Sequence, residues 1–159
     1  MTDTAAQPLH AGVLAPDFSL ASTAGDNVTL SSFRGQKHVL LAFFPLAFTS
    51  TCTAELCAFS EDFDQFTGKG VEVLPISVDA TPSLKEYKNA FSMKVDLLSD
   101  FKRDASRAYG VLNPDKFYAN RAYFLIDKFG EIRWAFVESH NGHHRENAEL
   151  LNEIAKLTD

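Results

Sequence analysis

Cysteine is scarce in this chain of 159 residues, which contains only Cys52 and Cys57. Two cysteines are too few for the disulfide framework of a small secreted domain. Their C-x4-C spacing is not the C-x2-C spacing found in zinc sites and in redox motifs. In a reducing compartment, such a pair is more often catalytic or metal-binding than a structural crosslink.

Long apolar runs and clusters of positive charge are also missing. No apolar stretch reaches the length of a membrane span, and the first ten residues, MTDTAAQPLH, lack the basic and apolar regions of a secretory signal. The formal net charge is -6, with no dense run of Lys and Arg to offset it. We therefore expect a cytoplasmic protein with neither a nucleic-acid nor a membrane partner.

Apolar residues, in contrast, are plentiful. They make up 45% of the chain, and 14 residues are phenylalanine, so a folded core is expected. The length fits one domain over residues 1–159, in which the polar segment 1–12 is expected to be mobile.

Hydrophobic periodicity predicts strands that first alternate with helices and then end in a hairpin and a helix. The predicted strands cover residues 18–20, 28–30, 38–44, 71–78, 95–98, 122–127 and 131–138. The predicted helices cover residues 52–66, 81–91 and 101–109, and a last helix has Ala148, Leu151, Ile154 and Ala155 on its apolar face. Pro75 marks a bulge or a weak strand, and Thr81 is expected to cap a helix. This order favours the α/β class, with one mixed central sheet flanked by helices on both faces.

Cys52 falls in the first turn of the helix that follows the predicted strand 38–44. Ligands of α/β sheets bind where strands hand over to helices, and the free N–H groups of a first turn favour a thiolate. A thiolate is more nucleophilic and more easily oxidised than a thiol. Thr49 either caps this helix or faces the same pocket. A cysteine in an apolar helix face is also a common core residue, and the pattern alone leaves both interpretations of Cys52 open.

The stretch PLAFTSTC fits P-x-x-x-T-x-x-C and resembles the signature around the peroxidatic cysteine of peroxiredoxins. The resemblance extends over roughly residues 12–138. It includes APDFSL near the start, TAE at 53–55, LLSD at 97–100, AYGV at 108–111 and NRAYFLID at 120–127. The branches that the chain most resembles are the alkyl hydroperoxide reductase E-type and bacterioferritin-comigratory proteins. The resemblance implies a thioredoxin-like fold with an N-terminal β-hairpin extension.

The resemblance also implies a function. The protein would be a thiol-dependent peroxidase that reduces hydrogen peroxide, organic hydroperoxides or peroxynitrite without a metal or organic cofactor. Cys52 resembles the attacking thiolate, Thr49 the residue that hydrogen-bonds the peroxide, and Pro45 the residue that shields the sulfur. Arg121 resembles the arginine that contacts thiolate and peroxide, and Glu55 an acid that orients it. The Arg121 guanidinium, the Cys52 backbone N–H and the Thr49 hydroxyl are hydrogen-bond donors of the kind that stabilises the negative charge developing on the departing oxygen. Thioredoxin, a glutaredoxin-like protein or a small thiol would supply electrons, and we expect a monomer or homodimer.

Cys57 is the second thiol available to condense with a Cys52 sulfenic acid. The two branches differ here, because a cysteine at this position often resolves in the comigratory branch and is often missing from the E-type. In an intact helix, residues five apart have Cα atoms roughly 8–9 Å apart, whereas a disulfide tolerates at most about 7 Å. We therefore predict that disulfide formation unwinds roughly Thr49 to Phe59. The alternative is a one-Cys enzyme in which Cys57 has no turnover role.

Two rival functions share the reactive Cys52. One is a thiol–disulfide oxidoreductase acting on proteins, and the other is a redox sensor without turnover. A histidine cluster in SHNGHHRE has the H-x-x-H spacing of metal ligands, but a solvated helix entry is the preferred interpretation of His140, His143 and His144.

Overall fold

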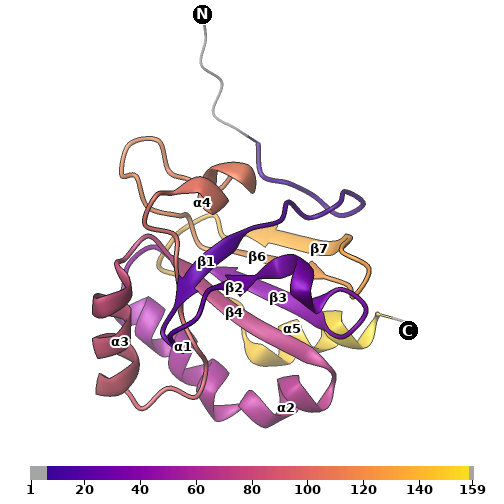
Figure 1. Ribbon diagram of the computed structural model, residues 1–159, viewed down its shortest axis with the longest axis horizontal. Coiled ribbons are helices and arrows are strands. Elements are labelled where there is room, and N and C mark those ends of the chain that lie inside the picture. Colours follow the sequence, from indigo (N-terminus) through magenta and orange to yellow (C-terminus); the bar gives the residue numbers. More distant parts are fainter. Residues whose placement is uncertain (1–6, 158–159) are drawn as a thin grey trace, which may run out of the picture.

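The computed structural model describes residues 7–157 of the chain. Within them, strands form one 7-stranded mixed sheet in the order β2-β1-β5-β4-β3-β6-β7 (Figure 1). The strands are β1 (Ser19–Ser22), β2 (Val28–Thr29), β3 (His38–Phe43), β4 (Val71–Ser77), β5 (Leu98–Ser99), β6 (Ala122–Ile126) and β7 (Ile132–Val137). The predicted mixed sheet and N-terminal hairpin are confirmed, because β1 and β2 pair antiparallel.

Strand β3 lies inside the sheet between β4 and β6, parallel to the first and antiparallel to the second. All its residues are buried, as expected for an apolar run covered on both faces. Leu40 and Ala42 pack into one core cluster, and Val39, Leu41 and Phe43 into the other. Because both faces of β3 are packed against the core, the loop that follows β3 starts from a rigid position at the carboxyl edge of the sheet.

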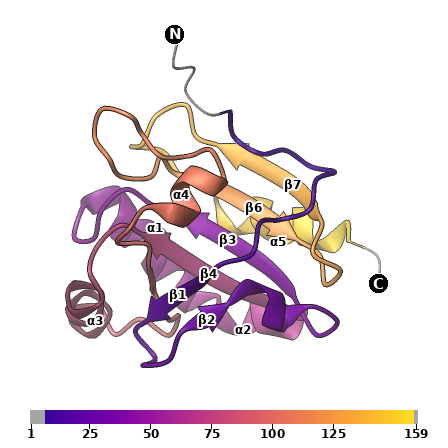
Figure 2. The ribbon, with the colours of Figure 1, turned by 45° about the horizontal axis from the view of Figure 1, so that its top comes forward.

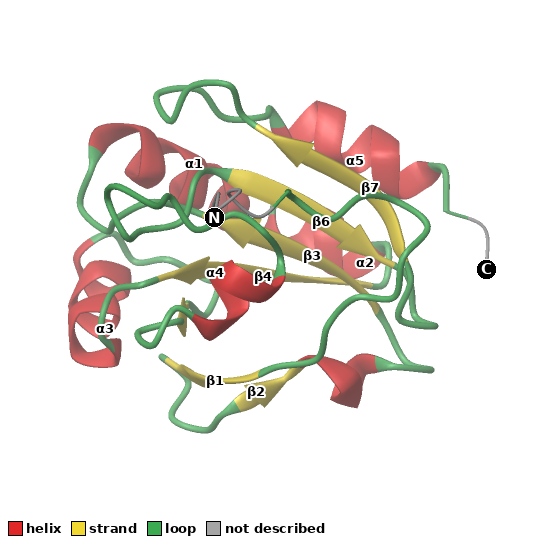
Figure 3. Cartoon of the chain, turned by 90° about the horizontal axis from the view of Figure 1, so that it is seen from above, coloured by secondary structure: helices red, strands yellow, loops and turns green. Residues whose placement is uncertain are grey.

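Helices cover both faces of the sheet, as predicted. The helices are α1 (Ser50–Glu61), α2 (Phe63–Gly68), α3 (Thr81–Ala90), α4 (Asp104–Ala108) and α5 (Asn147–Ala155), with a short 3-10 helix η1 (Leu30–Phe33). Figures 2 and 3 show α4 on the face opposite α1, α2 and α5. The core agrees, because Leu56, Phe66 and Leu150 share one cluster while Ala105 belongs to the other.

The single helix predicted over residues 52–66 is wrong in one respect, because it is two helices. Asp62 leaves the helical conformation, with φ -101° and ψ 18°, and separates α1 from α2. The side-chain amide of Asn147 donates to the Ala58 carbonyl and to the Asp62 carboxylate, both at 2.8 Å, and so fixes the break. Phe59 and Phe66 still pack into one core cluster, which explains why the periodicity continues through the break.

Three helix predictions need correction at their ends or faces. Thr81 is the first residue of α3 rather than its cap, which is Ala80. The helix α4 begins only at Asp104, because Arg103 adopts a left-handed conformation with φ 67°. In α5 the buried residues are Leu150 and Ile154. The predicted face was rotated, since the alanines at its two ends, 148 and 155, are exposed.

Strand β5 lies at Leu98–Ser99 rather than at residues 95–98, and Pro75 does not make a bulge. The Ile76 carbonyl accepts from the Phe44 N–H at 2.9 Å, so the Ile76 backbone faces β3. Because backbone groups alternate along a strand, the missing N–H of Pro75 faces β5, whose pairing begins only at Ile76. The proline therefore costs no ladder hydrogen bond.

The segment before β1 lies along the start of β7. Gly12 N donates to the Ile132 carbonyl at 2.8 Å, Ile132 N to the Val13 carbonyl at 2.9 Å, and Ala15 N to the Gly130 carbonyl at 2.9 Å. Of the segment predicted to be mobile, residues 1–6 lie outside the described residues, and the mobility of 1–12 stays a prediction. None of the helices in the described part of the chain has the length and apolar character to cross a membrane.

Candidate active site

The loop between β3 and α1 carries the first predicted site residues. Pro45 is buried two residues after the end of β3, and α1 begins at Ser50. The Asp79 carboxylate, just beyond β4, accepts from the Ala47 N–H at 2.8 Å and from the Ser77 hydroxyl at 2.8 Å. The loop is thus connected to β3 through the chain and to the end of β4 through Asp79. Cys52 follows this loop, in the first turn of α1.

Cys52 meets Arg121, which lies 69 residues further along the chain. The Nη2 atom of Arg121 lies 3.0 Å from the Cys52 Sγ. The cysteine is fully buried, and Arg121 immediately precedes β6 with an exposed fraction of 1%. The buried guanidinium thus places a permanent positive charge at hydrogen-bond distance from the Cys52 sulfur.

Arg121 is held from two further sides. Its Nη1 donates to Glu55 Oε1 at 2.6 Å, and Glu55, one turn after Cys52, is 1% exposed. The Asn141 carbonyl accepts from Arg121 Nε at 3.3 Å and Nη2 at 3.1 Å, and the Asn141 side-chain oxygen accepts from the Arg121 backbone N–H at 3.0 Å. These contacts fix the plane of the guanidinium against the sulfur.

Burial and charge oppose each other in this ion pair. Burial raises the pKa of Glu55, although the positive charge of Arg121 and a hydrogen bond from Tyr123 act in the other direction. Burial lowers the pKa of Arg121, but the charges of Glu55 and Cys52 and the hydrogen bonds to them outweigh it, so the pKa lies above its usual value. Arg121 therefore stays cationic beside the sulfur at every physiological pH.

Sequence reasoning did not identify Asn141 as a site residue, and its segment is more than a solvated helix entry. The only local signal was an Asn-Gly turn after a predicted strand. Tyr123 was missed as well, although strand alternation places it on the face of Leu125, toward α1. Its hydroxyl donates to Glu55 Oε2 and accepts from the Arg145 backbone N–H at 2.9 Å.

Thr49 does not cap α1 with its side chain, so one of its two predicted roles is wrong. It occupies the N-cap position, but its hydroxyl donates to the Leu46 carbonyl at 2.8 Å. Thr53 continues the helix by donating its N–H to the Thr49 carbonyl at 2.9 Å. Thr49 is exposed at the edge of the site.

Cys57 is a half-buried free thiol on α1, and Cys52 is free too. Burial raises the pKa of the Cys57 thiol, and the nearby charge of Glu61 adds to the increase. Cys57 lines a hollow of about 360 Å³ together with Ser60, Glu61, Phe91, Ser92 and Lys94. Since α1 is continuous between the cysteines, helical geometry keeps their Cα atoms roughly 8–9 Å apart.

The predicted histidine cluster places two rings side by side. The centroids of His140 and His143 are 5.3 Å apart, and the His140 Nδ1 accepts from the Gly142 N–H at 2.9 Å. Within residues 7–157, no group of three or more His, Cys, Asp or Glu side chains is placed to hold a metal ion.

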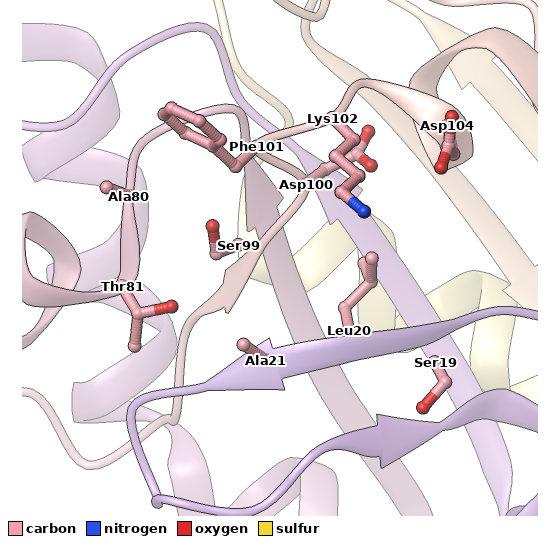
Figure 4. Close-up of a pocket in the computed structure, with 10 residues that line it drawn as sticks. All are labelled: Ser19, Leu20, Ala21, Ala80, Thr81, Ser99, Asp100, Phe101, Lys102 and Asp104. Carbon is pink, nitrogen blue, oxygen red and sulfur yellow. The ribbon is translucent and has the colours of Figure 1, made fainter.

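A separate hollow of about 490 Å³ opens between β1 and the loop after β5 (Figure 4). Figure 4 shows Leu20 and Ala21 on β1 facing the segment that carries Ser99 and Lys102. Its lining includes neither Cys52 nor Cys57, so it lies outside the thiol site.

Comparison with known proteins shows which family the chain belongs to. The sequence profile of the AhpC/TSA family matches residues 11–135. The chain belongs to this family. Alkyl hydroperoxide reductase E of Mycobacterium tuberculosis is 38% identical over 152 residues, covering 94% of this chain and 99% of that protein. Peroxiredoxin Bcp of Escherichia coli is 34% identical over 145 residues, covering 87% and 92%.

Solved peroxiredoxins share the fold of this AhpC/TSA protein. The reduced 2-Cys peroxiredoxin of Plasmodium vivax aligns with a TM-score of 0.85 at 33% identity, covering 93% of this chain and 81% of that one. The predicted resemblance to peroxiredoxins and the thioredoxin-like fold are thus confirmed. The chain is a thiol-dependent peroxidase, as predicted.

Proposed function

We propose that Cys52 is the peroxidatic nucleophile of this peroxidase and that it reduces hydrogen peroxide and organic hydroperoxides. The observation that carries the proposal is the 3.0 Å contact between the Arg121 Nη2 and the buried Sγ. The thiolate attacks one peroxide oxygen, the O–O bond breaks, and the electron pair leaves with the second oxygen. Cys52 becomes a sulfenic acid, and the departing oxygen takes a proton to leave as water or alcohol.

Arg121 has a donor to spare for the peroxide. A guanidinium carries five N–H groups. The Nε–H and one Nη2–H meet the Asn141 carbonyl, the other Nη2–H meets Cys52, and one Nη1–H meets Glu55. The second Nη1–H is the donor we assign to the developing oxyanion.

We assign the second set of donors to the loop and to the helix start. Thr49 contributes its hydroxyl after exchanging the Leu46 carbonyl for the peroxide, and Cys52 contributes its own backbone N–H in the first turn of α1. To Pro45, a buried residue of this loop, we assign the exclusion of water from the sulfur. Glu55 orients Arg121.

We further propose that Cys57 resolves the sulfenic acid. Its thiol condenses with the Cys52 sulfenic acid, an S–S bond forms, and water leaves. Thioredoxin or a glutaredoxin-like protein then reduces the disulfide. The half-exposed position of Cys57 beside an open hollow supports this role. The alternative remains a one-Cys enzyme that an external thiol recycles.

Stopped-flow reduction of peroxide tests the assignment, with thioredoxin supplied. Cys52→Ser is expected to abolish the reaction, whereas Cys57→Ser spares the first oxidation and changes recycling. Mass spectrometry after one equivalent of peroxide separates the two schemes. A loss of two hydrogens supports resolution by Cys57; a stable added oxygen in the wild type, or a dimer linked through Cys52, contradicts it.

The single domain over residues 1–159, the monomer or homodimer and the cytoplasmic location stay predictions from the sequence. A protein-disulfide oxidoreductase would reduce insulin faster than peroxide. A redox sensor would not turn over.

A further inference from the structure

Glu55 has two carboxylate oxygens and almost no access to water. Its exposed fraction is 1%, so each oxygen depends on a protein donor. Arg121 serves Oε1 and the Tyr123 hydroxyl serves Oε2. Tyr123 is thus linked to the reacting sulfur by three successive hydrogen bonds, through Glu55 and Arg121.

The direction of the Tyr123 hydrogen bond follows from its other partner. The Arg145 backbone N–H, 2.9 Å away, only donates, so it occupies a lone pair of the phenol oxygen. Burial raises the pKa of Tyr123, as does the charge of Glu55, so the phenol keeps its proton. Among the hydrogen bonds of the described residues, Glu55 is the acceptor left for that proton. A carboxylate accepts it, whereas a carboxylic acid protonated at Oε2 does not.

We propose that Tyr123 is a positioning residue, whose hydroxyl keeps Glu55 ionised and turned toward Arg121 and so holds the guanidinium in line with Cys52. The proposal rests on the proposed function, since it assigns how that site is kept in geometry. This role explains why Tyr123, on the face of β6 toward α1, carries a hydroxyl, although a phenyl ring would fill the same space.

The charges around Glu55 decide the sign of the expected effect. Arg121 and Cys52 lie on one side, and half-buried His144 acts on Glu55 from the segment before α5. The Arg145 guanidinium does not compete, because it pairs with Glu138 at 2.7 and 3.2 Å. If Glu55 takes up a proton, Arg121 loses a negative partner, and its charge then acts more fully on the sulfur.

Tyr123→Phe is the test, and two readouts, the rate of peroxide reduction and the pH midpoint of Cys52 alkylation, are both expected to decrease. Arg121 is less well oriented, so the second-order rate constant for peroxide falls roughly tenfold. The thiolate of Cys52 becomes easier to form, so the pH midpoint of its alkylation by iodoacetamide moves lower. Tyr109→Phe is the matched control, because Tyr109 is also a fully buried phenol and its hydroxyl donates to the Pro16 carbonyl at 2.7 Å, outside the site. It is expected to change neither readout.

A double-mutant cycle shows whether Tyr123 acts through Glu55. In a Glu55→Gln background no carboxylate remains to hold, so Tyr123→Phe is expected to alter the peroxide rate by less than about twofold. Equal effects of Tyr123→Phe in both backgrounds overturn the proposal, as do unchanged readouts or a fall in rate with the midpoint moved upward.

A second variant covers the case in which Tyr123→Phe fails to fold, as judged by circular dichroism. 4-Fluorophenylalanine at position 123 keeps a substituent in the place of the hydroxyl but removes the donor, so the peroxide rate is expected to fall and the alkylation midpoint to move to lower pH. An unchanged or higher midpoint contradicts the proposal. Failure of the proposed function is seen separately: Cys52→Ser would then still reduce peroxide.

Discussion

Oxidation by one equivalent of peroxide is predicted to unwind the first turns of α1. Along the helix, Cys52 and Cys57 are separated by about 7.5 Å of rise and about 140° of rotation, which places their Cα atoms roughly 8.7 Å apart. A disulfide needs about 5.5–6 Å and tolerates at most about 7 Å. The bond and the intact helix therefore exclude each other.

The cost of unwinding follows from what α1 buries. Leu56 and Phe59 have exposed fractions of 0% and 1%. Exposing a side chain of this size costs roughly 1.5–3 kcal/mol, so releasing both costs about 3–6 kcal/mol. In the reduced protein this corresponds to amide protection factors on the order of 10² to 10⁴ over residues 50–59.

Hydrogen exchange read by mass spectrometry measures this directly. Peptides from residues 50–59 are expected to lose almost all of that protection in the oxidised wild type, while peptides from β3 keep theirs. Cys57→Ser is the control, because it forms the Cys52 sulfenic acid but no intramolecular bond, and its helix should stay protected. An oxidised wild type that has lost two hydrogens yet keeps reduced-state protection over residues 50–59 would refute the geometric reasoning.

Three further substitutions test the site and the fold. Arg121→Lys keeps the charge but not the fork that reaches sulfur and carboxylate together, so stopped-flow peroxide reduction by Cys52 should slow roughly 10²- to 10³-fold; a rate within twofold of wild type contradicts the assignment. Burial raises the pKa of Asp127, but backbone hydrogen bonds and Arg133 outweigh it and lower the pKa. The unfolded chain then binds more protons between the two pKa values, so Asp127 stabilises the fold above about pH 4 and that stability is lost as the pH falls. Urea unfolding from pH 7 to 2 should therefore show a weaker acid dependence for Asp127→Asn than for wild type, and equal slopes would exclude the contribution. Leu41 is fully buried in β3, and Leu41→Ala should lower the free energy of unfolding by about 2–5 kcal/mol in urea titrations.

The sheet was predictable because its signals are local. The run His38–Phe43 is apolar at nearly every position, and β6 and β7 are joined by a short turn containing Gly130, whose φ of 91° suits glycine. The division between α1 and α2 was not predictable in this way. It depends on Asn147, more than 80 residues from Asp62, and no local pattern carries that contact.

The site was predictable as far as the peroxiredoxin signature reached. Cys52 and Glu55 share one helix, so their proximity follows from spacing, and Arg121 was expected to join them only through resemblance. Asn141 and Tyr123 have no such signature. Their roles arise because the chain after β7 returns to the carboxyl edge of the sheet, a tertiary arrangement that periodicity does not describe.

The backbone pairing of Gly12, Val13 and Ala15 with the first residues of β7 has a consequence for handling the protein. An uncovered outer strand offers a ladder of free amides to any extended peptide, including another copy of itself. Here the stretch that starts β7 is already occupied by the chain's own leading segment. Truncating the protein from its amino end past Ala15 would leave the start of β7 as an exposed edge strand with unpaired backbone groups. Self-association would then increase, even though every residue of the peroxide site remained in place.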